Sequence, residues 1–308
     1  ILDVATGVTA ATYTINNPGA TPSRIFTGLT PGTSYNVRLT IVLNGATVVC
    51  PTLTTFATTS AASGCDTGMD VAFIVDYTFS MGTVIEGIKT GIASIISTID
   101  SESGSNDYRL GLVLADESAT STPTYNTSVD YLALPASQRV INTGSSDYQF
   151  ITGVEMFQTN NGTTFTTQLN KINTGSNPPT SNWPLGMGSG FPEPTDMALG
   201  LVVEANEFLG AFRNGVAKYV IIYTDDLPGG DDDAFDSTDV TRLNSLGITC
   251  ATAGIKVFIL GLGVNRTYTP PGGTAIYPWR VLAAATSGNY TASYATSDVI
   301  AQITNGCA

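Results

Sequence analysis

Short apolar runs alternate with helical stripes over most of the chain from residue 70 onward. Four of these runs are almost continuously apolar, which predicts strands that are buried on both faces. They are Val71 to Val75, Arg109 to Ala115, Tyr219 to Thr224 and Val257 to Leu262. Strands that alternate with helices are typical of a mostly parallel sheet with helices on both faces. The pattern therefore predicts a doubly wound, Rossmann-like α/β domain.

Four helices are predicted between and after these strands. The first carries apolar residues at helical spacing, at Val84, Ile88, Ile92, Ile95 and Ile99. A second stripe runs from Ala198 to Phe212. Shorter helices are expected over Trp279 to Thr286 and over Asp298 to Thr304, the latter with Ser297 as its N-cap. The segment from Glu117 to Asn182 shows weak periodicity, and we predict little regular structure in it.

The first 60 residues follow the two-residue alternation of half-buried strands. Apolar side chains at alternate positions from Tyr35 to Ile41 predict one antiparallel strand. The segment from Gly28 to Tyr35 contains a Pro-Gly turn ahead of the tyrosine and resembles the tyrosine-corner segment of fibronectin type III domains. The resemblance implies a partial all-β domain over residues 1–59, which is either truncated or completed by another chain. Residues 60–64 are expected to be a linker to the α/β domain of residues 65–308.

Charge and composition narrow the possible functions. The chain has 25 acidic and 12 basic residues, a formal charge of −13. This charge opposes binding to phosphate backbones, so we expect no nucleic-acid partner. The longest apolar runs are shorter than the roughly 18 to 20 residues that cross a bilayer, so we expect no membrane insertion. Histidine is absent, which excludes Ser-His-Asp and Cys-His catalysis, and we expect no enzyme.

A carboxylate and two hydroxyls alternate where the first predicted strand of the α/β domain meets its helix. Asp76, Thr78 and Ser80 can converge on one point and offer the oxygen ligands that a hard cation requires. Asp225 follows another strand, and ligands of doubly wound sheets gather at the carboxyl ends of strands. The alternative is an ordinary helix N-terminus, because these residue types also cap helices. The acidic loop from Asp231 to Asp236 is expected to be solvated rather than a second cation site.

The turn from Asp76 to Met81 resembles the metal-ion-dependent adhesion site of von Willebrand factor A-type domains. The segment from Gly188 to Ala198 is similar to the Pro-Glu loop of integrin β subunits, which implies Glu193 as a further ligand, with Thr195 as the competing candidate. The resemblance to A-type domains extends from Asp70 to Cys307. Hydroxyl, carboxylate and water ligands favour Mg²⁺, with Mn²⁺ or Ca²⁺ as substitutes.

The resemblance also bears on two of the four cysteines. A disulfide that ties the two ends of the domain recurs in A-type domains, which implies a bond between Cys65 and Cys307. The alternative is two free, half-buried thiols. Such a bond favours an extracellular or surface-exposed location. Cys50 and Cys250 show no evident relation to each other, and no pairing is predicted for them.

The resemblance implies adhesion as the leading functional hypothesis. In such a protein, a partner's Asp or Glu completes the coordination of the bound cation. The alternative is a structural subunit of a surface appendage, filament or virion, in which the A-type domain is mainly an assembly module and neighbouring subunits are the partners. The incomplete N-terminal sheet favours this alternative, because an unpaired sheet edge invites strand addition from a neighbour.

Overall fold

The computed structural model describes most of the chain after residue 63 and five short strands before it. The described residues are 2–3, 34–37, 40–43, 46–49, 54–57, 64–104, 107–118, 129–143, 148–173, 183–184, 192–229 and 234–307. The chain divides into two units, Ile1–Ser63 and Gly64–Ala308.

Two small antiparallel sheets make up the described part of the first unit. One has the strand order β1-β2-β5, and the other pairs β3 with β4. The bounds are β1 Leu2–Asp3, β2 Ser34–Val37, β3 Thr40–Leu43, β4 Ala46–Val49 and β5 Thr54–Ala57. The prediction of one strand from Tyr35 to Ile41 is wrong, because Tyr35 pairs with Phe56 in one sheet and Ile41 pairs with Val48 in the other. Residues 28–33 of the predicted tyrosine corner, and Cys50, lie outside the described residues.

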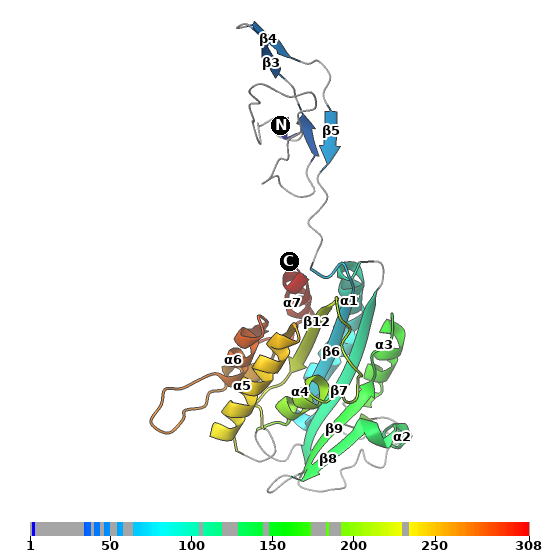
Figure 1. Cartoon of the computed structure of the whole chain (residues 1–308). Helices are drawn as coiled ribbons and strands as arrows, with labels where there is room; N and C mark the ends of the chain where they lie inside the picture. Colours follow the sequence, from blue (N-terminus) through cyan, green and yellow to red (C-terminus); the bar gives the residue numbers. More distant parts are fainter. Residues whose placement is uncertain are drawn as a thin grey trace. The chain divides into compact units, whose positions relative to one another are not determined.

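A seven-stranded sheet of order β14-β13-β12-β6-β7-β9-β8 forms the centre of the second unit (Figure 1). The pairs from β14 to β7 are parallel, and β9 is antiparallel to both β7 and β8. The bounds are β6 Met69–Asp76, β7 Tyr108–Ser118, β8 Arg139–Thr143, β9 Tyr148–Glu155, β12 Ala217–Tyr223, β13 Ile255–Leu260 and β14 Asn289–Thr291. A separate parallel pair joins β10 (Ile172–Asn173) to β11 (Trp183–Pro184).

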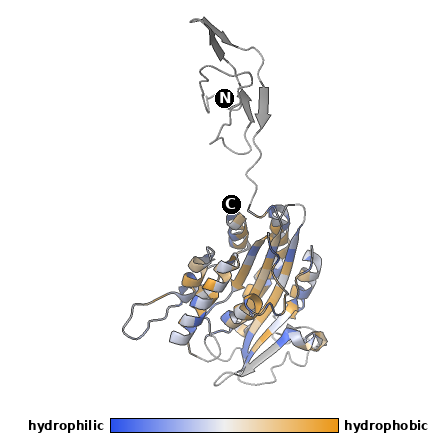
Figure 2. Cartoon of the chain, viewed as in Figure 1, coloured by the Kyte–Doolittle hydropathy of each residue, from blue (hydrophilic) through white to orange (hydrophobic). Residues whose placement is uncertain are grey.

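Helices cover both faces of the sheet. The α-helices are α1 Gly82–Glu102, α2 Val129–Ala133, α3 Gly162–Asn170, α4 Thr195–Val203, α5 Ser237–Thr252, α6 Pro278–Ala285 and α7 Thr296–Cys307. Short 3₁₀ helices are η1 Phe79–Met81, η3 Ala136–Gln138 and η4 Leu262–Asn265. Residues of α1, α3 and α7 share one apolar core, and residues of α4, α5 and α6 share the other. The strands between them are hydrophobic (Figure 2). The predicted fold class, a mostly parallel sheet flanked by helices, is confirmed.

The helical segment Phe79–Glu102 is long and apolar enough to cross a membrane by length and composition alone. The length of uninterrupted apolar runs did not identify this segment in the sequence, because polar residues interrupt its apolar stripe. In the fold, the isoleucines Ile85, Ile88, Ile92, Ile95 and Ile99 of this segment are buried in the core of the second unit. Core burial therefore accounts for its apolar composition.

The predicted helix from Ala198 to Phe212 is wrong beyond Val203, where α4 ends. Asn206 and Phe208 have φ angles of 53° and 65°, a left-handed conformation that a right-handed helix cannot contain. Phe208 is nevertheless buried in the same core as α4. The apolar spacing thus reflects burial in the core and not one continuous helix. At the other end of the unit α7 begins at Thr296, so Ser297 lies inside its first turn and is not the N-cap.

The region from Glu117 to Asn182 contains more regular structure than predicted. It holds β8 and β9, which extend the sheet, and the helices α2 and α3. The helix α2 was missed because it is only five residues long, and α3 because Thr, Asn and Gly dominate its sequence. In α3 only Gly162, Phe165 and Leu169 are buried, so one narrow apolar stripe carries the helix. The helix α5 was also missed. Its N-terminus is a capping box of Asp236 and Asp239.

Candidate metal centre

Two neighbouring strands bring the predicted ligands to one edge of the sheet. β6 ends at Asp76, and β12 ends at Tyr223, two residues before Asp225. The strand order reverses between them, because β7 lies on one side of β6 while β12 and β13 lie on the other. Ligands of doubly wound folds bind outside the carboxyl ends of strands at such a switch point.

The turn after β6 folds around the carboxylate of Asp76. The backbone N–H of Thr78 donates to Asp76 Oδ1 at 3.0 Å, and the Thr78 hydroxyl donates to the same oxygen at 2.7 Å. The Thr78 hydroxyl also lies 3.1 Å from Ser80 Oγ. On the other side, the Thr224 hydroxyl donates to Asp76 Oδ2 at 3.4 Å. Asp76 and Thr78 are buried and Ser80 is exposed, so this connected group of oxygens opens to solvent at Ser80.

Helix capping does not explain these residues. Thr78 is the N-cap of η1 and Met81 is the N-cap of α1, and neither side chain makes a capping hydrogen bond. The Thr78 hydroxyl is directed instead toward Asp76 and Ser80. The alternative interpretation of the turn as an ordinary helix N-terminus therefore loses its support.

The loop ahead of α4 places Glu193 at the same edge. The N–H of Glu193 donates to the carbonyl of Leu227 at 2.9 Å, and the Glu193 carbonyl accepts from the N–H of Gly229 at 2.7 Å. The loop thus pairs with the segment that follows β12. A Cβ at position 229 would lie 2.7 Å from the carbonyl oxygen of Pro192, so this close pairing requires glycine.

Three carboxylates meet at this edge. One oxygen from each of Asp76, Glu193 and Asp225 lies within 4.8 Å of the others. Asp76 is fully buried, Glu193 is 3% exposed, and Asp225 is half-buried. Burial first, and neighbouring carboxylates second, raise the pKa of Asp76 to about 8 and that of Glu193 to about 11. Without a counter-charge, the cluster therefore favours protonated carboxyl groups.

The donor set fits a hard divalent cation. Three carboxylates and two hydroxyls offer oxygen ligands only, which suits Mg²⁺ or Ca²⁺. Glu193 Oε2 is buried and has no hydrogen-bond partner among the described residues. A cation would supply that missing partner and offset the clustered negative charge. Within the same described residues Thr195 Oγ1 is likewise buried without a partner, so Thr195 stays open as the alternative ligand.

The sequence interpretation missed two further carboxylates. Asp116 and Glu117 lie at the end of β7, are each 1% exposed, and raise the pKa of Glu193 by their charge. The predicted strand stopped at Ala115, three residues before the end of β7. The rule that pointed to Asp225, a carboxylate at the carboxyl end of a parallel strand, would have identified both residues.

Two adjacent aspartates, Asp225 and Asp226, have different partners. Asp226 pairs with Arg266 at 2.9 Å and accepts a hydrogen bond from the N–H of Leu227 at 2.7 Å. Asp225 instead belongs to the carboxylate cluster. Of the acidic loop that follows, Asp236 caps α5 through a bond from the N–H of Thr238, and residues 231–233 lie outside the described residues.

The raised pKa values predict that the chelated protein loses stability as pH rises. Asp76 and Glu193 hold protons in the folded state that the unfolded chain releases near pH 4. The free energy of unfolding should therefore fall from about pH 4 to pH 8, by up to about 1.4 kcal/mol per pH unit for each retained proton. Urea denaturation in EDTA at several pH values measures this. A stability that rises across this window would contradict it, and an Asp76→Asn variant should show a shallower fall.

A disulfide between Cys65 and Cys307 closes the second unit, with their Cα atoms 5.2 Å apart. Cys65 precedes β6 and Cys307 ends α7, and both are buried. The N–H of Gly64 also donates to the carbonyl of Cys307 at 2.5 Å. Cys250 is a buried free thiol in α5.

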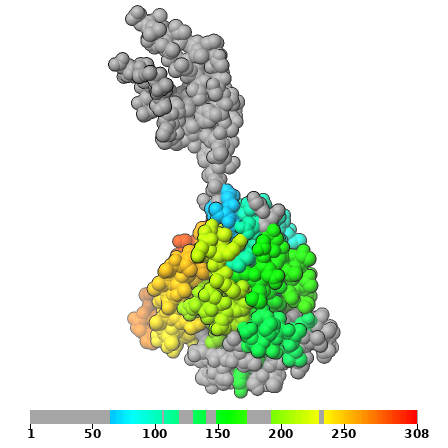
Figure 3. Space-filling model, turned by 45° about the vertical axis from the view of Figure 1, so that its right-hand side comes forward, coloured from blue at the N-terminus to red at the C-terminus, as the bar shows by residue number. Residues whose placement is uncertain are grey.

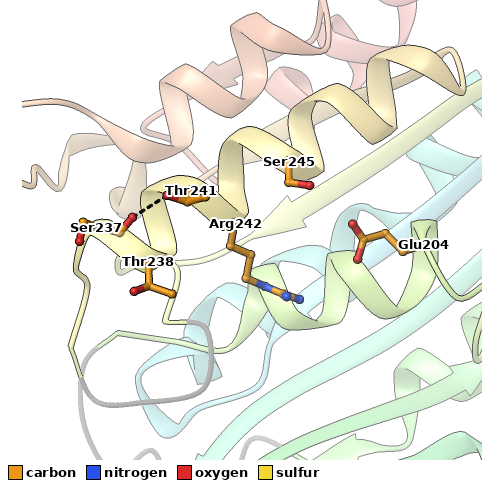
Figure 4. A pocket seen from close by; sticks show the side chains of 6 residues that line it. All are labelled: Glu204, Ser237, Thr238, Thr241, Arg242 and Ser245. Atoms are coloured by element: carbon orange, nitrogen blue, oxygen red, sulfur yellow. Dashed lines mark hydrogen bonds between the residues drawn. The ribbon is translucent and has the colours of Figure 1, made fainter.

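A polar groove lies apart from this centre, between α4 and α5. It encloses about 600 Å³ and is lined by Glu204, Ser237, Thr238, Thr241, Arg242 and Ser245 (Figure 4). The yellow atoms of Figure 3 show that α5 forms part of the molecular surface. Arg242 lies 3.3 Å from the buried carboxylate of Asp196, so it joins the two helices electrostatically. We therefore interpret this groove as a helix contact rather than as the functional site.

No protein-family model matches the sequence, and no curated protein matches it. Among solved structures, proximal thread matrix protein 1 from the mussel byssus matches at 11% identity with a TM-score of 0.43, over 80% of this chain and 47% of that one. The pilus adhesin SpaC from Lactobacillus rhamnosus GG in its open conformation matches at 13% identity and a TM-score of 0.44, over 90% and 32%. The SpRpn10 VWA domain matches at 9% and 0.40, over 76% and 94%.

Likenesses this distant carry no argument about function. The fold class rests instead on the strand order and helix placement of the second unit, which are those of a doubly wound α/β domain. That arrangement is the one that a resemblance to von Willebrand factor A-type domains implies. The chain spans about half the length of the mussel structure and about a third of the adhesin.

Proposed function

We propose that the second unit binds a divalent cation, with Mg²⁺ preferred, and through it an acidic side chain of a protein partner. The observation that carries the proposal is the convergence of Asp76, Glu193 and Asp225 within 4.8 Å at the switch point of the sheet. The hydroxyls of Thr78 and Ser80 would complete the protein's share of the ligands. Mn²⁺ or Ca²⁺ would be the substitutes.

An exposed side of the centre supports binding of an external ligand. Ser80 is exposed and Asp225 is half-buried, whereas Asp76 and Glu193 are enclosed. A cation held here would present its remaining coordination positions to solvent. A partner carboxylate is the matching ligand, because it is a strong oxygen donor and because the cation would offset the repulsion between two acidic surfaces.

The proposed role is adhesion outside the cytosol. Disulfides persist in oxidising surroundings, and the bond between Cys65 and Cys307 is consistent with an extracellular or cell-surface location. Binding is favoured over catalysis, because the sequence has no histidine and the clustered carboxylates are assigned to the cation.

Binding of a carboxylate peptide should require both the cation and the carboxylate. The probe is a biotinylated, end-capped peptide Gly-Ser-Glu-Ser-Gly on a sensor surface, with Gly-Ser-Gln-Ser-Gly as the matched control. We expect the protein in Mg²⁺ to bind the first peptide at least about tenfold more tightly than the second, because the amide lacks the charge that the cation attracts. EDTA should remove the difference. Equal binding of both peptides in Mg²⁺ would refute the proposed function.

The structural-subunit alternative has one observation in its favour. The described strands of the first unit form sheets of only three and two strands, which are small for independent stability. If that unit assembles with neighbouring subunits, electron microscopy and light scattering should show oligomers that persist in EDTA. Such cation-independent assembly, together with equal binding of the two peptides, would favour the alternative.

A further inference from the structure

Two large apolar side chains are strongly exposed beside the proposed metal centre. Phe79 is 68% exposed and Leu262 is 55% exposed. Phe79 lies between Thr78 and Ser80 in the turn that follows β6, and Leu262 begins the short helix η4 after β13. Both therefore project from loops at the carboxyl edge of the parallel strands.

Hydrogen bonds through Tyr294 and Thr224 connect the Leu262 loop to the carboxylate cluster. The N–H of Leu262 donates to the hydroxyl of Tyr294 at 3.1 Å, and that hydroxyl donates to the carbonyl of Thr224 at 3.2 Å. The hydroxyl of Thr224 in turn donates to Asp76 at 3.4 Å. The charges of Asp225 and Asp76 also raise the pKa of Tyr294, although burial contributes more. A chain of three hydrogen bonds therefore links the backbone of Leu262 to Asp76.

The backbone fixes Leu262 in its exposed position. Gly261 has a φ angle of 121°, and a Cβ there would lie 2.2 Å from the carbonyl oxygen of Thr224. A Cβ on Gly263 would lie 2.4 Å from the carbonyl oxygen of Asp226. Two glycines therefore pack the loop tightly against the end of β12, and the leucine between them points away from the core.

We infer that the partner presents one acidic side chain flanked by apolar side chains, which pack against Phe79 and Leu262 while the carboxylate reaches the cation. This inference rests on the proposed function and adds the chemistry of the partner. A polyanion fits poorly, because the chain carries a formal charge of −13 and every further negative charge would be repelled. Apolar neighbours gain burial without that repulsion.

Two peptides with the same carboxylate test the inference. Biotinylated, end-capped Gly-Leu-Glu-Leu-Gly is compared with Gly-Ser-Glu-Ser-Gly for binding to the full chain in Mg²⁺. We expect the apolar peptide to bind about tenfold more tightly, because its leucines bury apolar surface against the two side chains. Phe79→Ser and Leu262→Ser should each reduce this preference. Ile248→Ser is the matched control, because Ile248 is 69% exposed on α5 and near the opposite end of β13.

The outcomes separate this inference from the proposed function. If the wild type binds both peptides equally and only in Mg²⁺, the metal function stands and the apolar contact is refuted. A preference that survives both Phe79→Ser and Leu262→Ser would also overturn the assignment. Failure of Mg²⁺-loaded protein to bind either peptide would refute the proposed function together with this inference. The Mg²⁺ affinity of each variant is measured by calorimetry. If Phe79→Ser lowers that affinity, the peptide preference of Leu262→Ser alone tests the apolar contact.

Discussion

Replacing Asp76 with alanine is expected to abolish cation binding while the fold survives. The hydroxyls of Thr78 and Thr224 both donate to the carboxylate of Asp76. Loss of this carboxylate should lower the affinity for Mg²⁺ by at least about 100-fold. The stability gain that the cation confers on the wild type, about 4 kcal/mol at 1,000 times the dissociation constant, should disappear. Binding of the carboxylate peptide should disappear with it.

The stability of the metal-free protein should change little. Substitution leaves the N–H of Thr78 without its acceptor, which costs about 1 kcal/mol. It also removes a buried polar group, whose transfer from water into the protein opposes folding. The two effects oppose each other, so we expect a change within about 1 kcal/mol.

Calorimetric titration with Mg²⁺ and urea denaturation measure these effects, with circular dichroism as the folding check. Asp66→Ala is a suitable control, because it removes the same charge from an exposed residue next to the start of β6, at the opposite edge of the sheet. A folded Asp76→Ala protein that retains wild-type Mg²⁺ affinity would exclude the proposed centre.

Opening the disulfide is expected to produce a large loss of stability. The bond joins residues separated by 242 positions, and closing a loop of that length lowers the entropy of the unfolded chain by an amount worth about 5 kcal/mol in the chain-entropy model. For a unit of this size, such a loss lowers the melting temperature by roughly 10 to 20 °C. A Cys65→Ala, Cys307→Ala double variant should show this shift without a reducing agent.

Reducing agent provides an internal control for this experiment. It should destabilise the wild type and leave the double variant unchanged, because the remaining described cysteine, Cys250, is already a free thiol. Calorimetric melting with and without the reductant distinguishes the cases. Equal melting temperatures for oxidised wild type and double variant would show that the bond does not stabilise the unit.

The sequence predicted the centre of the sheet better than its periphery. The strands β6, β7, β12 and β13 are buried on both faces, so each produces a nearly continuous apolar run. The edge strand β8 and its neighbour β9 lack such a run, and their positions depend on pairing with each other and with β7. Pairing energy rather than local pattern places these elements.

The candidate metal centre could likewise be predicted only in part from local sequence. Asp76, Thr78 and Ser80 lie in one turn, so their local spacing was sufficient to associate them. Asp225 required the topological rule about strand ends, and Glu193 required the resemblance to the Pro-Glu loop. The exposure of Phe79 could not be predicted, because an aromatic residue next to a buried strand is more often part of the core.

The paired ends of the second unit have a mechanical consequence. Cys65 and Cys307 are covalently joined at Cα atoms 5.2 Å apart, so tension applied between residues 64 and 308 enters and leaves the unit at the same point. The load then passes through a sulfur–sulfur bond instead of shearing β6 from its neighbours. Pulling on the oxidised protein by these two positions should extend it by only a few residues, whereas the reduced protein should unravel at modest force. An attachment of this kind would let the edge that carries the candidate metal centre stay folded while the chain is under load.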